Sequence, residues 1–205
     1  MEFAGVVVLG YLLGSCPWGY WLVKLVRHED VRNAGSGNVG ASNVFRSYGV
    51  SLGLPVLALD VLKGFVPALL GVIYVSHVCA IVGGAAAMLG HWRPLFLKFE
   101  RGGKMVATAG GIFFAIAPLV AGSAVGIWLA LWLVLGYASI ASILASGFLP
   151  VGAALYGYPR EVVAFAAATF VGVLYLHRPN LVRLWHRSES RSRVALLPRL
   201  WSARP

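Results

Sequence analysis

Apolar residues along the chain fall into long runs that short polar or glycine-rich segments interrupt. The runs lie near residues 3–25, 52–75, 78–91, 105–120, 122–144, 147–158 and 162–176. A helix needs about 20 apolar residues to cross a bilayer, because it rises about 1.5 Å per residue through hydrocarbon about 30 Å thick. The pattern therefore predicts an all-α integral membrane protein with a bundle of about seven transmembrane helices, of which the third, fourth and sixth are short.

Glycine and proline mark the expected breaks between the runs, because both favour turns and proline cannot donate a helical hydrogen bond. The breaks are expected at Gly49, Pro118-Leu119, Gly147 to Pro150 and Gly157 to Pro159. No internal repeat is evident in the sequence. We therefore expect a single membrane-embedded domain over residues 1–187 and a basic tail over residues 188–205.

The composition supports a membrane protein and excludes other classes. Of the 205 residues, 59% are hydrophobic and 12% are charged, whereas a soluble domain has about 25% charged residues. The net charge of +10 does not indicate a nucleic-acid partner, because the basic residues flank apolar runs, where they orient helices and contact anionic lipids. Cys16 and Cys79 lie within apolar runs, so no disulfide framework is expected. Residues 3–23 are expected to span the membrane and not to be cleaved as a signal peptide.

The positions of lysine and arginine predict the orientation in the membrane. With the amino terminus outside, 15 of the 17 basic residues fall on one side, in the segments 24–46 and 93–104 and in the carboxyl-terminal segment after the last run. Basic loops stay in the cytoplasm. We therefore expect the polar segments described next to face the cytoplasm.

The first polar segment covers residues 32–43 and contains three glycines and three asparagines. Glycine lets the backbone approach a ligand and present its N–H groups to an anion, and arginine can bind phosphate in a bidentate manner. A solvated interhelical loop is the alternative, but asparagine supplies donors and acceptors that a linker does not require. We expect a phosphate site whose candidate residues are Ser15, Arg32, Gly35, Ser36, Gly37, Asn38, Gly40, Ser42, Asn43 and Arg46.

The second polar segment covers residues 90–108. Pro94 ends the preceding helix, and aromatic residues indicate the membrane interface. A glycine pair followed by lysine places a charge beside exposed amides, although the frame of a Walker A loop is absent. An interfacial loop with an anchoring lysine and a packing histidine is the alternative. The candidate ligands are His91, Gly102, Gly103, Lys104 and Thr108.

The third polar segment begins at His177, where the last run ends. Its arginines alone would indicate a stop-transfer cluster, but Asn180 and Glu189 do not anchor helices. Arg183 lies between them, and we expect Arg183 and Glu189 to be among the residues that bind the substrates or their phosphates. A carboxylate among cations is stabilised in its charged form, so we expect Glu189 to have a lowered pKa and to orient a cation instead of removing a proton.

Two pairs of polar residues lie inside apolar runs. Asp60 and Lys63 are expected to form an i,i+3 ion pair that faces the bundle interior, because unpaired charges in a bilayer are costly; a structural and a substrate-facing role both remain open. Ser139 and Ser142 lie one turn apart and could project together, although serines commonly pack between membrane helices. No metal, nicotinamide or serine-hydrolase motif is present, so no metal or cofactor is expected.

These segments together resemble the bacterial acyl-phosphate:glycerol-3-phosphate acyltransferase family. The first resembles its Gly-Ser-Gly-Asn-x-Gly-Ala-Thr-Asn element, the second its Gly-His…Gly-Gly-Lys…Ala-Thr element, and the third its His-Arg-x-Asn…Arg-Leu…Glu element. The likeness covers residues 15–191. The chain has Ser42 where the family has threonine, Met105 where it has glycine, and Arg187 where it commonly has glycine.

The resemblance implies transfer of a fatty acyl group from acyl phosphate to the sn-1 hydroxyl of glycerol 3-phosphate, giving lysophosphatidic acid and phosphate. This is the first step of phospholipid synthesis, at the cytoplasmic face of the bacterial inner membrane. No protein nucleophile or base is evident, so we expect direct attack by the glycerol hydroxyl, with the donor phosphate accepting the proton. The expected catalytic residues are Lys104, Ser142, His177 and Asn180.

The expected assignments divide these residues between two phosphates. Arg46, Lys104 and Asn180 would hold the donor phosphate, while Arg32, His177 and Ser142 would hold glycerol phosphate and the carbonyl. The expected partners are the two substrates and membrane lipids, with a monomer as the working oligomeric state. A small phosphate or lipid transporter is the alternative, although such proteins place their sites near the midplane. An impaired relative of the acyltransferase, suggested by Met105, is a third interpretation.

Overall fold

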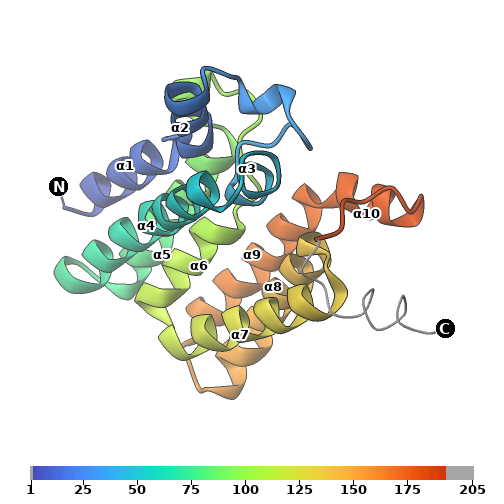
Figure 1. Ribbon diagram of the computed structural model, residues 1–205. Coiled ribbons are helices and arrows are strands. Elements are labelled where there is room, and N and C mark those ends of the chain that lie inside the picture. Colours follow the sequence, from blue (N-terminus) through green and yellow to red (C-terminus); the bar gives the residue numbers. More distant parts are fainter. Residues whose placement is uncertain (1, 193–205) are drawn as a thin grey trace. The chain divides into compact units, whose positions relative to one another are not determined.

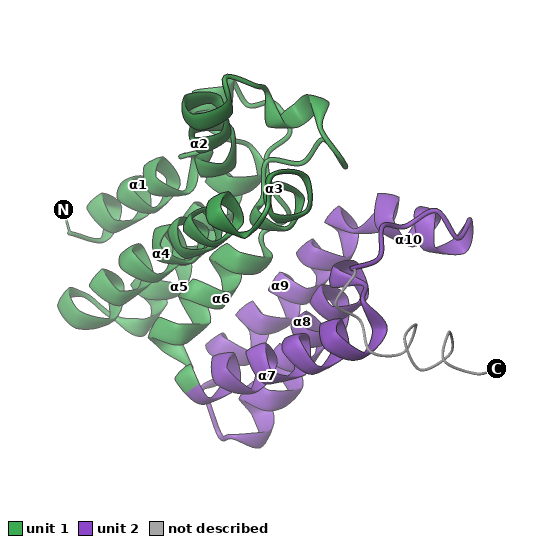
Figure 2. Cartoon of the chain, viewed as in Figure 1, with its two compact units in different colours: residues 1–118 green, residues 119–205 purple. Residues whose placement is uncertain are grey.

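The computed structural model describes residues 2–192, and this part of the chain consists of helices and loops without strands (Figure 1). The chain divides into two compact units, residues 1–118 and residues 119–205 (Figure 2). The helical content confirms the predicted all-α class. Most of the predicted basic tail lies outside the described residues, and the single-domain boundary at residue 187 stays a prediction.

Unit 1 is organised around one long helix. Its helices are α1 (Glu2–Gly14), α2 (Trp18–Arg27), α3 (Ala41–Tyr48), α4 (Val50–Tyr74), α5 (His77–Trp92) and α6 (Val106–Ile116), with two 3₁₀ turns, η1 (Val31–Asn33) and η2 (Leu95–Leu97). Helix α4 packs against α1, α3, α5 and α6, and α1 also packs against α5. The loops after α2 and α5, which carry the first two polar segments, are therefore held by the same group of helices.

Small residues bring these helices into backbone contact. A Cβ atom added at Gly10 of α1 would lie 2.2 Å from the carbonyl oxygen of Gly83 on α5, and one added at Gly14 would lie 2.2 Å from that of Ala87. Between α4 and α6, a Cβ at Gly64 would lie 2.1 Å from the carbonyl oxygen of Thr108. Membrane helices pack closely through such small residues. The positions of the loops in unit 1 thus follow from contacts that only glycine permits.

Unit 2 contains α7 (Pro118–Leu135), α8 (Ala138–Leu155), α9 (Arg160–Leu176) and α10 (Arg178–Trp185). Helices α8 and α9 pack against each other. Helix α10 continues from α9 with a bend of 52°. The third polar segment occupies this bend, α10 and the residues that follow it.

The boundary predicted between the fifth and sixth runs is wrong. The turn lies at Gly136, which has a φ of 80°, and Gly147 and Pro150 lie inside α8. Glycine adopts this left-handed conformation at little cost, and proline inside a membrane helix is tolerated where neighbouring groups satisfy the freed carbonyl. The other three predicted breaks coincide with helix ends.

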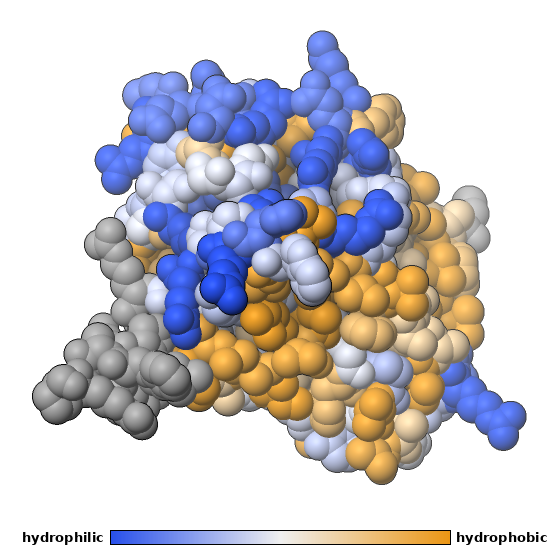
Figure 3. Space-filling model, turned by 90° about the vertical axis from the view of Figure 1, so that its right-hand side faces the viewer, coloured by the Kyte–Doolittle hydropathy of each residue, from blue (hydrophilic) through white to orange (hydrophobic). Residues whose placement is uncertain are grey.

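The first predicted run contains two helices, α1 and α2, and each of the other six corresponds largely to one helix, but fewer meet the length and composition of a span. Among the described residues, four segments do so, namely 2–27, 50–74, 118–135 and 138–155, or five if α9 and α10 count as one bent span. Helix α5 has 16 residues and α6 has 11. Exposed leucines such as Leu57 and Leu129 lie on these segments, and hydrophobic residues cover a broad area of the face in Figure 3. Such surfaces fit a lipid environment.

Candidate active site

The first polar loop is folded around the side chain of Asn43. Its Oδ1 accepts a hydrogen bond from the backbone N–H of Ser36 at 2.9 Å, and its Nδ2 donates to the carbonyl of Ala34 at 2.9 Å. Gly35 between them has a φ of 56°, and a Cβ there would lie 2.4 Å from Oδ1 of Asn43. Val39 and Val44 anchor the loop in an apolar cluster. The loop therefore has a defined conformation.

Asn38 joins this loop to the second polar loop. Its Oδ1 accepts from the N–H of Gly40 at 2.9 Å, and its Nδ2 donates to the carbonyl of Gly102 at 3.0 Å. Two of the three asparagines that favoured a phosphate site are thus used to build the loops. The first-turn N–H groups of α3, at Ala41 and Ser42, have no acceptor within the helix, as at the start of any helix. They form the part of the loop that is suited to an anion.

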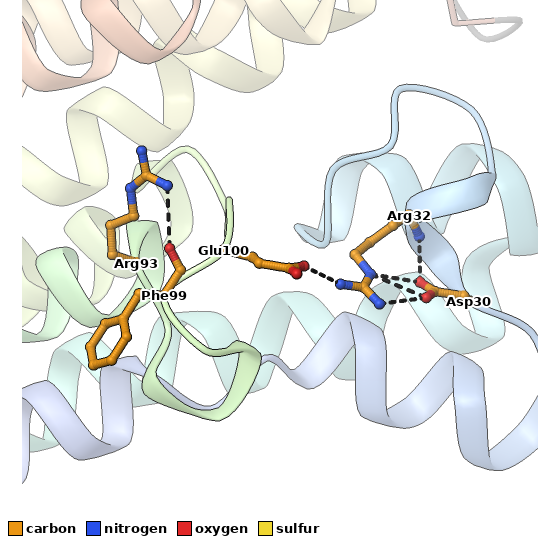
Figure 4. A network of polar contacts seen from close by, with 5 residues as sticks. All are labelled: Asp30, Arg32, Arg93, Phe99 and Glu100. Atoms are coloured by element: carbon orange, nitrogen blue, oxygen red, sulfur yellow. Dashed lines mark hydrogen bonds and ion pairs between the residues drawn. The ribbon is translucent and has the colours of Figure 1, made fainter.

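Arg32 contacts carboxylates from both loops (Figure 4). Its Nε and Nη2 donate to Asp30, with Nη2 at 2.7 Å from Oδ2, and its Nη1 donates to Glu100. The hydrogen bond from Arg32 lowers the pKa of Asp30. Arg32 was expected to bind a substrate phosphate, and neither Asp30 nor Glu100 was among the candidate residues. Arg46 is exposed on the last turn of α3.

The second loop pairs with the end of α5. The N–H of Gly102 donates to the carbonyl of Trp92, and the N–H of Gly103 donates to that of His91, both at 2.9 Å. A Cβ at Gly103 would lie 1.9 Å from Nε2 of His91. The glycine pair is therefore required by contact with α5, independently of any ligand. Lys104 follows it directly and is partly exposed.

A buried ionic network lies beneath these loops. Lys63 Nζ is 2.8 Å from Asp60 Oδ1, and both side chains are 3% exposed, which confirms the predicted i,i+3 pair. Lys63 also donates to the carbonyl of Cys16 at 3.1 Å, at the break between α1 and α2. Nδ1 of His91 is 3.8 Å from Asp60. His91 thus belongs to a network that joins α4, α5 and the α1–α2 break.

Two buried hydroxyl groups of unit 1 remain without a hydrogen-bond partner in the described part of the chain. They are Ser15 Oγ, at the end of α1, and Thr108 Oγ1, in the first turn of α6. A buried hydroxyl normally finds a partner, because leaving it unpaired costs about 1–3 kcal/mol. Both residues were predicted as candidate ligands, and that role stays a prediction.

In unit 2, Glu189 is surrounded by donors. Its Oε1 accepts from Ser139 at 2.9 Å and from Asn180 at 2.7 Å, and its Oε2 accepts from Arg183 Nε at 2.7 Å. Burial alone would raise the pKa of Glu189, but these hydrogen bonds outweigh burial and lower it. The carboxylate orients Arg183, in agreement with the prediction from its charge environment. Its bonds to Asn180 and Ser139 were not anticipated.

His177 lies at the bend between α9 and α10 and is 4% exposed. Its Nδ1 is 2.8 Å from the carbonyl oxygen of Val173. A carbonyl oxygen can only accept, so Nδ1 carries a proton and donates it to this carbonyl.

Ser142 Oγ accepts from the indole Nε1 of Trp128 at 3.0 Å. Ser139 donates to Glu189, so the two serines, which lie one turn apart on α8, have different partners. No tryptophan of α7 was selected from the sequence, although a partly buried indole N–H usually finds an acceptor.

The candidate residues thus form two groups, one in each unit. The loops and the Asp60–Lys63–His91 network belong to unit 1, and Ser142, His177, Asn180, Arg183 and Glu189 belong to unit 2. In residues 2–192, no three histidine, cysteine or acidic side chains gather as metal ligands would.

Comparison with known proteins identifies the family. A family model described as glycerol-3-phosphate acyltransferase matches residues 4–187. The chain belongs to this family. The chain is 43% identical over 195 residues to a protein of Aquifex aeolicus named glycerol-3-phosphate acyltransferase, and the alignment covers 93% of this chain and all of that protein. It is 39% identical over 186 residues to a protein of the same name from Desulforudis audaxviator, with 91% of this chain and 93% of that protein covered.

Two solved structures of the family share the fold. The glycerol 3-phosphate form of PlsY (YgiH), an integral membrane glycerol 3-phosphate acyltransferase, is 40% identical with a TM-score of 0.88, covering 93% of this chain and 96% of that one. The lysophosphatidic acid form is 38% identical with a TM-score of 0.86, covering 95% and 97%. This glycerol-3-phosphate acyltransferase is accordingly a multi-pass integral membrane protein.

Proposed function

We propose that this protein transfers a fatty acyl group from acyl phosphate to the sn-1 hydroxyl of glycerol 3-phosphate, giving lysophosphatidic acid and phosphate. Acyl transfer to glycerol 3-phosphate follows from the family. The observation that supports a phosphate site is the bond from Asn38 to Gly102, which holds two cationic glycine loops together at the start of α3. We place this reaction at the cytoplasmic face of the bacterial inner membrane, where the basic loops are expected.

Both substrates bring a phosphate, and the residues divide between them. In unit 1, Arg46, Lys104 and the first-turn amides of α3 bind the phosphate of the donor, and Arg32 binds glycerol 3-phosphate. In unit 2, we assign Asn180 to phosphate binding and His177 and Ser142 to binding glycerol 3-phosphate and the acyl carbonyl. Fixed cations and amides stabilise the charge that develops on the carbonyl oxygen and on the departing phosphate, because they need no reorganisation during the reaction.

The chemistry requires no covalent intermediate with the protein. The hydroxyl oxygen of glycerol 3-phosphate attacks the acyl carbon, the bond from this carbon to the phosphate oxygen breaks, and the departing phosphate takes the hydroxyl proton. Glu189 is unsuited to act as a base, since three donors occupy its carboxylate and its pKa is lowered. We assign His177, at the bend between α9 and α10, to orienting the attacking hydroxyl.

The donor is tested by incubating the purified protein with glycerol 3-phosphate and either an acyl phosphate or the matching acyl thioester. We expect lysophosphatidic acid and phosphate in equal amounts with acyl phosphate and no product with the thioester. Product from the thioester alone would contradict the proposed donor. His177→Ala tests the base-free step: if this variant still binds glycerol 3-phosphate but loses all acyl transfer, the donor phosphate is not the proton acceptor.

A further inference from the structure

Arg32 holds its two carboxylate partners in different ways. Asp30 is two residues away, contacts Nε and Nη2, and also accepts the backbone N–H of Arg32 at 2.9 Å. Glu100 comes from the second loop, 68 residues away, and contacts only Nη1. The side chain of Asp30 is 23% exposed, while that of Glu100 is 60% exposed. Asp30 is therefore a fixed local partner, and Glu100 is a remote and solvated one (Figure 4).

The backbone that carries Glu100 is well defined. The N–H of Phe99 donates to the carbonyl of Pro94 at 2.9 Å, and that of Glu100 donates to Leu97 at 3.0 Å. Nη1 of Arg93 donates to the carbonyl of Phe99 at 3.2 Å (Figure 4). The side chain of Glu100 extends from this turn toward Arg32 (Figure 4). The loop thus presents a single carboxylate to one edge of the guanidinium.

The ion pair between Arg32 and Glu100 is weak enough for another anion to replace Glu100. Ion pairs between exposed side chains contribute about 0–1 kcal/mol. A phosphate group carries a charge of about −1.5 to −2 and three acceptor oxygens, so it binds a guanidinium more strongly than a carboxylate does. The bond from Asn38 to Gly102 joins the two loops independently. The loops therefore remain connected when Glu100 leaves Arg32.

We propose that Glu100 is the resident anion of Arg32, which a substrate phosphate displaces, so that Glu100 sets the affinity of this site for phosphate. Asp30 keeps the guanidinium oriented during the exchange, because it occupies the other edge. A monoanion would bind Arg32 about as strongly as Glu100 does. A phosphate dianion would bind more strongly, because it has a larger negative charge and more acceptor oxygens. This inference rests on the proposed function in assigning a substrate phosphate to Arg32.

The test is Glu100→Gln, which keeps the size of the side chain and removes its charge. Binding is measured without acyl donor, from the thermal stabilisation of the purified protein by glycerol 3-phosphate and by inorganic phosphate. We expect the half-saturating concentrations to fall about two- to fivefold, which corresponds to the loss of an exposed ion pair. In the acyl-transfer assay, KM for glycerol 3-phosphate should fall by a similar factor, with a smaller change in kcat.

Glu29→Gln is the matched control, since it removes an equal charge near the same loop from a carboxylate that accepts from Tyr48 and not from Arg32. It should leave the half-saturating concentrations unchanged. In an Arg32→Gln background, Glu100→Gln should have no further effect on binding.

Unchanged or weaker binding in Glu100→Gln overturns the proposal, as does an equal gain in Glu29→Gln. A wild-type protein that binds glycerol 3-phosphate without transferring an acyl group would refute the proposed function. The comparison of ligand binding between wild type and Glu100→Gln would still test the role of Glu100. A wild-type protein that binds neither ligand would refute the role of Glu100 as well.

Discussion

Asn38 and Asn43 use their side-chain amides on the protein's own backbone, and this changes how the first loop is interpreted. The three asparagines of this loop favoured a ligand site, because a flexible linker does not need side-chain donors and acceptors. A loop with a defined conformation also needs such donors and acceptors to bind its own backbone. Near-neighbour contacts were predictable: the pair of Asp60 and Lys63 follows from helical spacing and the cost of an unpaired charge. The contact of Arg32 with Glu100 was not, because it depends on how two distant loops fold.

The ionised side chain of Glu189 is expected to stabilise the fold in a way that depends on pH. Because its pKa is lowered in the folded protein, the ionised carboxylate stabilises the fold above its unfolded pKa, and this contribution is lost as pH falls through the folded pKa. Glu189→Gln should destabilise the protein by about 1–3 kcal/mol near neutral pH, because the donors around the carboxylate lose a charged acceptor. The difference in thermal midpoint between wild type and variant should narrow as the pH is lowered below the usual carboxyl range.

Glu161→Gln is the control for this measurement, since Glu161 is an exposed carboxylate on α9. It should shift the midpoint little at any pH. Parallel pH profiles for wild type and Glu189→Gln would show that the carboxylate contributes no acid-sensitive stability.

Helix boundaries depend on whether glycine and proline terminate a helix or pack within it. Gly136 and Gly147 look alike in the sequence, but Gly136 has a positive φ at the α7–α8 turn, while Gly147 lies inside α8 and faces Phe170 of α9. That packing involves residues distant in sequence, so the local pattern placed the break too late. The breaks at Gly49 and Gly157 were predictable because little competes with turn formation at those exposed positions.

The residue that precedes α6 has a left-handed backbone conformation. Met105 precedes the helix with a φ of 69°, where the family pattern has glycine, and its side chain is 7% exposed. Met105→Gly and Met105→Ala both remove the buried side chain, but only glycine relieves the left-handed strain of about 1–2 kcal/mol. Met105→Gly should therefore unfold at a higher temperature than Met105→Ala.

Gly110, inside α6, serves as the comparison because an added Cβ meets nothing within 4 Å there. Gly110→Ala should be neutral or stabilising, which is the usual order of alanine and glycine in a helix. If Met105→Ala is the more stable of the two variants at position 105, the left-handed conformation carries no cost.

The composition and charge of the whole chain predicted its class correctly, since so much apolar surface has no place in a soluble core. The seven runs correspond to the helices from α1 to α9 other than α3, with α1 and α2 sharing the first run, but helices as short as α6 do not meet a span criterion based on length. A hydropathy window also cannot identify which polar segments meet, because those contacts depend on the packing of entire helices. The network of Asp60, Lys63 and His91 is one such result.

The orientation of the protein in the membrane can be tested by labelling loops on its two sides. We expect the loop containing Lys98 in the cytoplasm and the loop before Arg160 outside, because basic residues concentrate on the first side. In a background with Cys16→Ala and Cys79→Ala, a membrane-impermeant maleimide applied to right-side-out vesicles should label Arg160→Cys. Lys98→Cys should be labelled only after the vesicles are opened. The opposite labelling would reverse the proposed orientation of the site.

The pair of Asp60 and Lys63 has a consequence for the biogenesis of the protein. Both residues lie on α4, so the two charges enter the membrane together. Their mutual attraction offsets part of the cost of inserting either one. We therefore expect that α4 can enter the bilayer before α5 has been synthesised. The ion pair between Asp60 and Lys63 can form at that stage, and its contact with His91 of α5 forms later.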